Sequence, residues 1–430
     1  MKYYSLQNPS YTTSFQEAVV KGLAPNKGLF FPSVIPHLPE GFIEQIESYS
    51  NQEIAFQLIS PYVAEAFETD ILNRIINETL CFDLPLVTLS EKVGVLELFH
   101  GPTMAFKDIG ARFMAQCLGH FYRNEDKEIT VLVATSGDTG GAVANGFLKV
   151  PGVQVVILYP SGKVSPIQEL QLTTLGHNIK ALEVEGTFDD CQQMVKTAFM
   201  DQDLTDQSTL TSANSINVAR WLPQMIYFLL GYKQLEEKNT PWVISVPSGN
   251  FGNLCAGMLA HKMGMPCHKF IASTNVNKTV PDYLKTALYN PKTSIQTISN
   301  AMDVGDPSNF RRILEIYKSD HEALTADLAG YWFTDDQTRG AIVALEQQFG
   351  YTADPHGAVA YLGLMKYMEG HPGVQGTFLE TAHPAKFKEE VEATLSVTLD
   401  LPSQLASFAG RTKIAENIAS YDDFKAYMMR

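Results

Sequence analysis

From about residue 91 onward, apolar strand-like segments alternate with amphipathic helical segments, and this alternation most limits the possible folds. The segments expected to form strands are 93–99, 129–135, 153–159, 179–184, 242–246, 269–273 and 376–380. The intervening segments expected to form helices are 109–123, 140–149, 165–175, 188–200, 216–235, 253–263 and 338–349. Strands separated by helices form parallel sheets, which bind ligands at the carboxyl ends of their strands. The sequence therefore predicts an α/β protein.

The length of the chain implies more than one folding unit. Single hydrophobic cores stop growing at about 250–300 residues, and this chain has 430. We expect a mostly helical N-terminal extension at 1–90, a small α/β domain at 110–225, and a large α/β domain formed by 91–109 with 226–430. A cleft between two such domains is the usual position of a ligand site.

Charge and cysteine content exclude several classes of function. The formal net charge of −15 disfavours nucleic acid and anionic membranes as partners. The five cysteines are scattered, without the spacing of a disulfide framework or a metal site. The N-terminus lacks the apolar core of a signal peptide, and the apolar run 225–230 is far shorter than the ~20 residues that span a bilayer. We expect a cytoplasmic protein without a metal.

The stretch from His100 to Gly110 joins an expected strand to an expected helix and contains a lysine in an unusual place. Pro102 helps to break the strand, and Asp108 can lie in the first turn of the helix. Lys107 then lies among apolar residues beside the positive end of a helix, and both surroundings lower the pKa of an amine. A neutral, fixed amine suits Schiff-base chemistry. On this stretch alone, a surface lysine paired with Asp108 is the simpler explanation.

Two further strands end in loops rich in glycine. Residues 135–140 (Thr-Ser-Gly-Asp-Thr-Gly) match neither the dinucleotide fingerprint nor the nucleoside-triphosphate loop. Residues 248–253 (Ser-Gly-Asn-Phe-Gly-Asn) supply backbone N–H groups at the start of a helix but no lysine, which favours a monophosphate ester. A tight strand–helix turn without a ligand remains open for both loops.

A fourth segment and one more strand end add other functional groups. Asn214 and Ser215 precede Arg220 at the start of an apolar helix, where neutral donors and a guanidinium can surround a phosphate. Taken alone, this segment is explained more simply by a helix cap with a solvated arginine. Thr381 follows the strand at 376–380, and its hydroxyl can pair with a neutral ring nitrogen. His383 could act as a general base, although a structural histidine before a proline is the more common case.

Together these segments resemble the threonine synthases, which are pyridoxal-phosphate enzymes of the tryptophan synthase β-like fold, also called fold type II. The resemblance covers essentially the whole chain and is closest to the bacterial type with a long N-terminal extension. Beyond the segments already described, it rests on residues 14–18, 28–32, 274–277, 299–303, 354–356 and 381–387. It implies that the two parallel-sheet domains are of the fold type II kind.

The resemblance also implies a role for each matching residue. Lys107 would be the catalytic lysine and would bind pyridoxal 5'-phosphate as a Schiff base. The other cofactor-binding residues would be Asp138, Ser248, Gly249, Asn250, Phe251, Gly252, Asn253 and Thr381, with the loop at 249–253 on the phosphate and Thr381 on the ring nitrogen. The substrate-binding residues would be Thr135, Ser136 and Thr139 for the carboxylate, and Asn214, Ser215 and Arg220 for the substrate phosphate.

One position departs from the common pattern. Many relatives with this fold carry asparagine where Asp138 stands, as the partner of the 3'-oxygen of the cofactor ring. An aspartate facing a phenolate oxygen would repel it unless a proton is shared. The role of Asp138 is therefore the open question of the implied site.

The implied reaction converts O-phospho-L-homoserine and water to L-threonine and phosphate, the last step of threonine biosynthesis, in a monomer or a homodimer. The nearest alternative is another enzyme of the same fold, such as a serine/threonine dehydratase or another β-replacement enzyme. The group around Arg220 argues against this alternative, because it provides a second anion site, which only a phosphorylated substrate needs. A binding module of a different class, using the same loops without catalysis, would be colourless.

Overall fold

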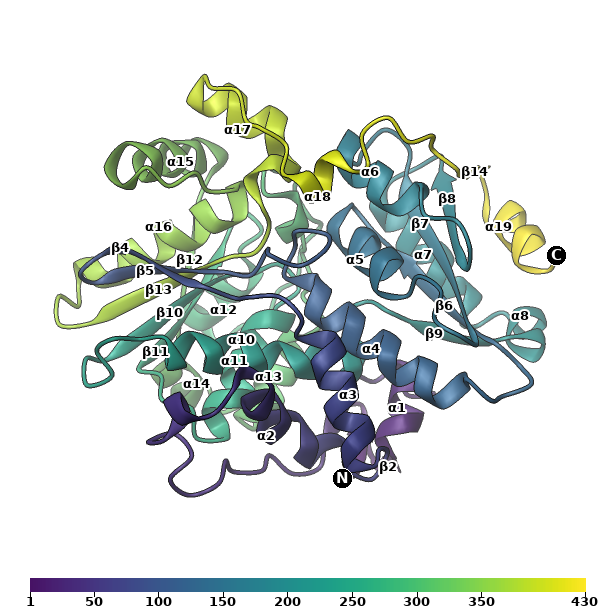
Figure 1. Cartoon of the computed structure of the whole chain (residues 1–430), viewed down its shortest axis with the longest axis horizontal. Coiled ribbons are helices and arrows are strands. Elements are labelled where there is room, and N and C mark those ends of the chain that lie inside the picture. Colours follow the sequence, from purple (N-terminus) through teal and green to yellow (C-terminus); the bar gives the residue numbers. More distant parts are fainter.

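Two mainly parallel sheets, each flanked by helices, form the frame of the molecule (Figure 1). The computed structural model describes residues 1–430. The six-stranded sheet has the order β12 (Leu328–Trp332), β11 (Lys269–Thr274), β10 (Trp242–Pro247), β13 (Gln375–Glu380), β5 (Val93–Glu97) and β4 (Leu86–Ser90). The five-stranded sheet has the order β14 (Glu416–Ile418), β8 (Ile179–Val184), β7 (Val153–Pro160), β6 (Ile129–Ala134) and β9 (Thr209–Ser212). Within both sheets only the pair β4 and β5 is antiparallel.

The helices that connect and cover these strands are spread along the whole chain. The α-helices are α1 (Phe15–Lys21), α2 (Asn51–Val63), α3 (Thr69–Thr79), α4 (Lys107–Tyr122), α5 (Asp138–Gly146), α6 (Pro166–Thr173), α7 (Phe188–Ala198), α8 (Gln202–Gln207), α9 (Val218–Trp221), α10 (Met225–Lys233), α11 (Gly252–Lys262), α12 (Thr279–Thr286), α13 (Phe310–Ile316), α14 (His321–Asp327), α15 (Asp335–Phe349), α16 (Pro355–Glu369), α17 (Lys388–Leu395), α18 (Ser403–Ala406) and α19 (Tyr421–Met428). The short 3-10 helices are η1 (Ile46–Ser48), η2 (Leu222–Gln224), η3 (Asn300–Met302) and η4 (Pro384–Phe387). None of these helices is long and apolar enough to span a bilayer.

The α/β prediction is confirmed, and each strand expected from the alternation is present. The expected helix at 216–235 is instead three pieces, α9, η2 and α10. Pro223 lies in the middle piece, and a proline has no N–H to donate and clashes with the preceding turn, which interrupts a regular helix.

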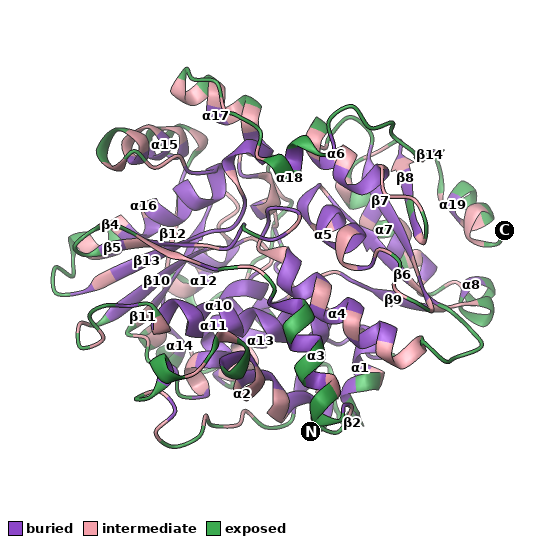
Figure 2. Cartoon of the chain, viewed as in Figure 1, coloured by how far each residue is buried: buried purple, intermediate pink, exposed green.

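The N-terminal segment is less purely helical than expected. A three-stranded antiparallel sheet of order β2 (Asn8–Thr13), β1 (Tyr3–Ser5) and β3 (Phe30–Pro32) precedes and follows α1, and α2 and α3 come after it. The buried side chains of this segment, such as Tyr62, belong to the same large apolar cluster as Ile157 of the five-stranded sheet and Ile244 of the six-stranded sheet. Figure 2 shows this buried interior running through the helices between the two sheets. The extension is therefore part of the main core.

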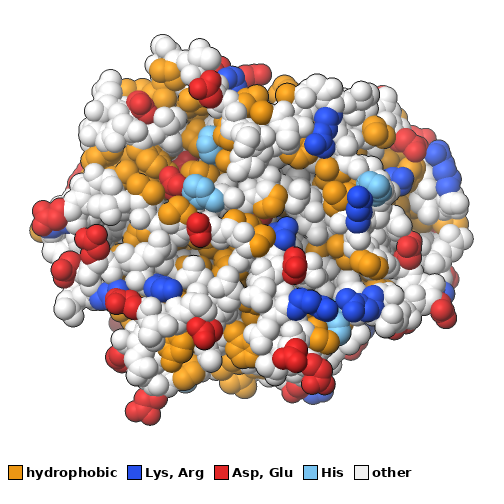
Figure 3. Space-filling model, viewed as in Figure 1, with side chains coloured by type: hydrophobic (Ala, Val, Ile, Leu, Met, Phe, Trp, Pro, Cys, Tyr) orange, Lys and Arg blue, Asp and Glu red, His pale blue; other side chains and the backbone are white.

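The C-terminal segment does not stay with the six-stranded sheet. The expected division assigned 226–430 to the large domain, whereas β14 lies at the edge of the five-stranded sheet beside β8. Figure 1 shows this last part of the chain passing from α17 over α18 to β14 and α19. Apart from this strand, the domain boundaries remain a prediction. On the face shown in Figure 3, acidic and basic side chains are interspersed, so the negative net charge is not gathered into one patch there.

Candidate active site

The predicted site residues follow the carboxyl ends of five parallel strands, and those around Asn214, Ser215 and Arg220 follow β9. Lys107 follows β5, Asp138 follows β6, the segment 248–253 follows β10, and Thr381 follows β13. Because β13 pairs with both β5 and β10, three of these loops emerge at one edge of the six-stranded sheet. The chain then runs from β5 through α4 to β6 of the other sheet, which places Lys107 at the junction between the sheets.

Lys107 is the first residue of α4 and is half-buried. Burial lowers the pKa of its amine to about 8, the carboxylate of Asp138 opposes this shift, and the positive charges of Lys386 and Arg220 add to it. The direction is the one that the sequence predicts. A substantial fraction of this amine is therefore neutral at physiological pH.

Asp108 does not pair with Lys107. It is buried, and its carboxylate accepts hydrogen bonds from the Thr103 backbone N–H at 2.9 Å and from the Thr103 hydroxyl at 2.6 Å. The backbone of the same stretch is tied to the end of β13, because the Phe106 N–H donates to the carbonyl of Thr381 at 2.8 Å. These bonds fix the turn before α4 and argue against a surface lysine paired with Asp108.

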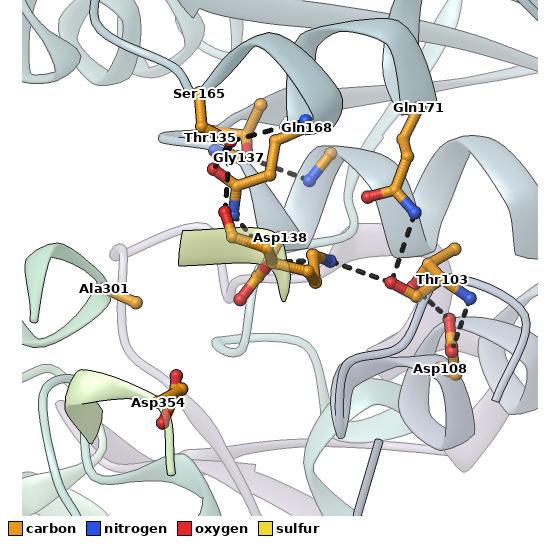
Figure 4. A network of polar contacts seen from close by, with 12 residues as sticks. Thr103, Asp108, Thr135, Gly137, Asp138, Ser165, Gln168, Gln171, Ala301 and Asp354 are labelled. Atoms are coloured by element: carbon orange, nitrogen blue, oxygen red, sulfur yellow. Dashed lines mark hydrogen bonds and ion pairs between the residues drawn. The ribbon is translucent and has the colours of Figure 1, made fainter. Parts of the chain in front are cut away.

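Asp138 is the first residue of α5 and forms a buried ion pair across the two sheets. Its Oδ1 lies 2.6 Å from Nζ of Lys386, which is in η4, and accepts a hydrogen bond from Nε2 of Gln168 at 2.8 Å (Figure 4). Burial raises the pKa of the Asp138 carboxyl, but Lys386 and Lys107 outweigh burial and bring its pKa below the usual range. Asp138 is therefore ionised, and its charge is balanced by Lys386.

The loop that carries Asp138 is shaped by Thr135. The Thr135 hydroxyl oxygen accepts hydrogen bonds from the N–H groups of Gly137 at 3.0 Å and Gly140 at 2.8 Å. The hydroxyl hydrogen of Thr135 is still available as a donor, because both of these bonds use its oxygen as the acceptor. Ser136 in this loop and Thr139 in the first turn of α5 are both half-buried. Three hydroxyls are thus grouped at the start of α5.

The loop after β10 has the features of an anion cradle. Phe251 has a left-handed backbone with φ of 62° just before the start of α11. A Cβ on Gly249 would lie 2.6 Å from Cα of Met302, so only glycine fits there. Asn253 is 6% exposed, yet neither the nitrogen nor the oxygen of its side-chain amide has a partner in the protein. Buried amides are nearly always paired, so this helix start fits a phosphate group that the chain itself does not supply.

The other residues of this loop are engaged within the protein. Ser248 is buried and donates its hydroxyl to the carbonyl of Val246 at 2.9 Å. Asn250 donates its amide to the hydroxyl of Ser215 at 2.6 Å. Gly252 is the first residue of α11. The contact between Asn250 and Ser215 brings the predicted cofactor-phosphate loop against the predicted substrate-phosphate segment.

Arg220 is buried rather than solvated, contrary to the simpler explanation of its segment. It is 3% exposed, donates from Nη1 to the carbonyl of Ala213 at 2.6 Å, and leaves Nε without a partner. Burial lowers the pKa of its guanidinium to about 10, against the opposing influence of Tyr227 and Asp108. The guanidinium thus has a donor to spare, and its charge acts on Lys107. Asn214, nearby in sequence, donates to the carbonyl of Ala134 at 3.1 Å.

Sequence reasoning missed a second buried arginine that holds this segment in place. Arg312 of α13 is 0% exposed and donates to the carbonyls of Phe30 and Ile216 and to the side chain of Asn309. Its Nη1 also donates to the carbonyl of Ser215 at 3.2 Å. Backbone carbonyls serve as its partners, so no charge pattern in the sequence could have revealed this role.

Thr381 and His383 have different surroundings. Thr381 is 6% exposed, and its carbonyl accepts a hydrogen bond from the N–H of Phe106, next to Lys107, at 2.8 Å. His383 caps η4 by accepting a hydrogen bond from the N–H of Ala385 at 3.1 Å. Burial, with a smaller contribution from His100, lowers the pKa of His383 to about 4. These contacts favour the structural interpretation of His383.

Comparison with known proteins places this architecture in a family. A family model described as "Pyridoxal-phosphate dependent enzyme" matches residues 75–375, "Threonine synthase N terminus" matches 2–80, and "Threonine synthase, C-terminal" matches 357–428. The threonine synthase of Escherichia coli K12 is 44% identical over 427 residues, which cover 99% of this chain and 98% of that protein. This chain belongs to the threonine synthase family. The threonine synthase of Haemophilus influenzae is 42% identical over 432 residues, which cover 100% of both chains.

Solved structures agree with this assignment. The crystal structure of threonine synthase from E. coli matches with a TM-score of 0.93 and covers 100% of this chain and 99% of that chain. A pyridoxal-phosphate-bound threonine synthase from Brucella melitensis matches with a TM-score of 0.92 at 31% identity and covers 100% of this chain and 98% of that chain. The fold type II prediction is confirmed, and the cofactor of this family member is pyridoxal phosphate.

Proposed function

We propose that this chain is a threonine synthase of the bacterial type with an N-terminal extension. It converts O-phospho-L-homoserine and water to L-threonine and phosphate, as the last step of threonine biosynthesis. The reaction breaks the carbon–oxygen bond of a phosphate ester, so the enzyme is a lyase. It works in the cytoplasm as a monomer or a homodimer. The observation that carries the proposal is a buried arginine with an unpaired Nε close enough to act on the pKa of Lys107.

The chain offers complementary groups for each part of the cofactor. Lys107 would hold it covalently, the backbone N–H groups of residues 249–253 and the Asn253 amide would bind its phosphate, and the hydroxyl of Thr381 would pair with its ring nitrogen. A hydroxyl partner would leave that nitrogen largely unprotonated, unlike a carboxylate. When bound, the cofactor withdraws electrons from the substrate carbon and makes the adjacent C–H bonds acidic.

Lys107 also moves protons. Its amine is held at the first turn of α4, from where it would reach the substrate Cα. With a pKa of about 8, the amine can accept a proton from the substrate Cα and return it elsewhere near physiological pH. A surface lysine with an ordinary pKa of ~10.4 would be protonated and unable to do so.

The two anionic ends of the substrate fit two separate groups of residues. Thr135, Ser136 and Thr139 offer hydroxyl donors for the carboxylate. Arg220 offers its spare Nε–H for the phosphate, with Asn214 and Ser215 beside it. A guanidinium in a water-poor setting binds phosphate with charge-assisted hydrogen bonds, and it keeps the released phosphate near the carbon that water must attack.

The nearest alternative is a dehydratase or another β-replacement enzyme of the same fold. The substrates of those enzymes carry no phosphate, so they would leave the buried guanidinium of Arg220 without a ligand. Incubation of the enzyme with O-phosphohomoserine should release phosphate faster than incubation with threonine yields an oxoacid. The opposite order of rates contradicts the proposal. A yellow protein whose borohydride-reduced adduct maps to Lys107 excludes a non-catalytic binding module, and an adduct on another lysine refutes the assignment of Lys107.

A further inference from the structure

Lys386 is a buried lysine to which the sequence pattern assigns no role. Its side chain is 0% exposed, and the Asp138 side chain with which it pairs is 5% exposed. A lysine ammonium is almost never fully buried unless it is paired. Beyond Asp138, Nζ donates to the carbonyl of Thr103 at 2.8 Å. The ammonium is therefore fixed by two oxygens that come from different parts of the chain.

These contacts connect three of the loops that surround Lys107. Thr103 belongs to the turn after β5, Asp138 begins α5 after β6, and Lys386 follows β13. Two further bonds brace the arrangement, because Gln171 also donates to the carbonyl of Thr103 at 3.2 Å and Ser165 donates to the carbonyl of Lys386 at 3.3 Å. Figure 4 shows the network as one continuous chain of contacts from α6 to the turn that precedes α4.

The ion pair also answers the electrostatic problem of an aspartate in this loop. An unpaired carboxylate here would repel a phenolate oxygen and attract the Lys107 ammonium. Lys386 and Gln168 both approach Oδ1 of Asp138, while the protein offers no hydrogen bond to Oδ2. The neutralised carboxylate can therefore keep one oxygen for another partner.

We propose that Lys386 is a positioning residue of this site: it neutralises Asp138, ties the two sheets together around Lys107, and thereby keeps the Lys107 amine reactive. The proposal rests on the proposed function only in taking Lys107 as the lysine that binds the cofactor. Neither the neutralisation of Asp138 nor the link between the two sheets involves the substrate.

The charged groups that act on Lys107 set the expected behaviour. Asp138 of α5 raises the pKa of Lys107, whereas Lys386 of η4 and Arg220 of α9 lower it. Loss of Lys386 removes one lowering charge and releases Asp138 to attract the ammonium, so both effects raise this pKa. Loss of the Asp138 charge acts in the opposite direction. Removal of both charges should leave the pKa of Lys107 near its original value.

The test compares Lys386→Met, Asp138→Asn and the double variant with the parent protein. The pH dependence of Lys107 labelling by an amine reagent is followed by peptide mass spectrometry in the cofactor-free full chain. The visible absorbance of the bound cofactor is titrated in parallel. We expect the pKa of Lys107 to rise by about one or more in Lys386→Met, to fall in Asp138→Asn, and to lie between these in the double variant.

A matched control separates this effect from the general loss of an ion pair. Lys413 pairs with Glu169 at 2.7 Å and Glu183 at 2.6 Å and is not among the charges that act on Lys107, so Lys413→Met should leave the Lys107 titration unchanged. An unchanged titration in Lys386→Met as well overturns the proposal. If Lys386→Met is too unstable for the titration, the thermal unfolding temperatures of the two variants are compared instead. The double variant must be more stable than Lys386→Met, because it also removes the carboxylate that has lost its partner. Equal or lower stability of the double variant also overturns the proposal.

This test is independent of turnover. If the parent protein releases no phosphate from O-phosphohomoserine, the proposed function fails, while the Lys107 titrations still report on Lys386. If phosphate is released but the titrations do not move, the proposed function stands and only the role of Lys386 is refuted.

Discussion

Replacement of Arg220 by methionine tests the proposed substrate-phosphate site most directly. Methionine keeps the apolar stem and removes the guanidinium. The environment makes the change specific, because the hydrogen-bond partner of the guanidinium is the backbone carbonyl of Ala213 rather than a carboxylate. The backbone of Arg220 also packs against α4, where a Cβ on Gly110 would lie 2.6 Å from the Arg220 carbonyl oxygen. This tight backbone contact should keep α9 in place in the variant.

The magnitude follows from the donors that are free. Nη1 is already engaged, whereas Nε has no partner, so we count one hydrogen bond to the substrate phosphate. A hydrogen bond to a charged group contributes about 1.5–3 kcal/mol. Because ~1.4 kcal/mol is a factor of ten, kcat/KM for O-phosphohomoserine should fall by about 10- to 150-fold. Arg220→Lys should lose less, since it keeps the charge but not the planar fork.

The assay measures phosphate release at several substrate concentrations, together with inhibition by inorganic phosphate. Both the substrate and inorganic phosphate should bind more weakly in Arg220→Met. Arg112→Met is the control, because Arg112 lies on α4, donates to the carbonyl of Glu78 and lies 3.9 Å from the carboxylate of the same residue. If kcat/KM changes by less than about threefold in a folded Arg220→Met protein, the phosphate is held elsewhere.

Three further predictions concern the cofactor and the core. Lys107→Ala should lose the visible absorbance and the borohydride adduct, with activity reduced at least ~100-fold; retained colour would contradict the assignment. Gly249→Ala should weaken cofactor binding about tenfold or more in an absorbance titration, because the Cβ of the alanine would lie 2.6 Å from Cα of Met302. An unchanged affinity for the cofactor would show that the loop can shift to accommodate the alanine. Glu380 is 0% exposed, and burial raises its pKa well above the usual range. Above the ordinary carboxyl pKa, Glu380 ionises in the unfolded state but stays protonated in the folded state. The stability of the wild type therefore falls as pH rises, by up to ~1.4 kcal/mol per pH unit. Glu380→Gln should therefore gain stability relative to wild type between about pH 5 and pH 8 in denaturant titrations, and a pH-independent difference would refute this.

The sequence predicts the parallel strands well because these strands are buried on both faces. β6 and β10 are mostly apolar runs bounded by loop residues, and such runs are typical of parallel sheets. The sequence does not predict α16, for a related reason. It is buried along most of its length against β10, β11 and β13, so it lacks the polar face that gives a helix its recognisable period. β14 is short and mostly exposed, and only its pairing with β8 reveals it.

The site divides in the same way between local and long-range features. Lys107, Gly249 and Asn253 occupy strand–helix junctions, so their neighbourhood follows from adjacent sequence. The burial of Arg220 and the fixing role of Arg312 depend on which backbone carbonyls fold against them. Such partners have no signature in residue type, because every residue carries a carbonyl.

Asp138 and Lys386 combine both kinds of information. The resemblance singles out Asp138 as a charge that would not suit the proposed place beside the cofactor ring, and the structure supplies the buried ammonium that balances it at 2.6 Å. Either charge alone should be destabilising, because a buried ion without its partner costs stability. A family member with asparagine at the position of Asp138 should therefore carry a neutral residue at the position of Lys386. A folded relative with asparagine at the first position and a buried, unpaired lysine at the second would contradict this coupling.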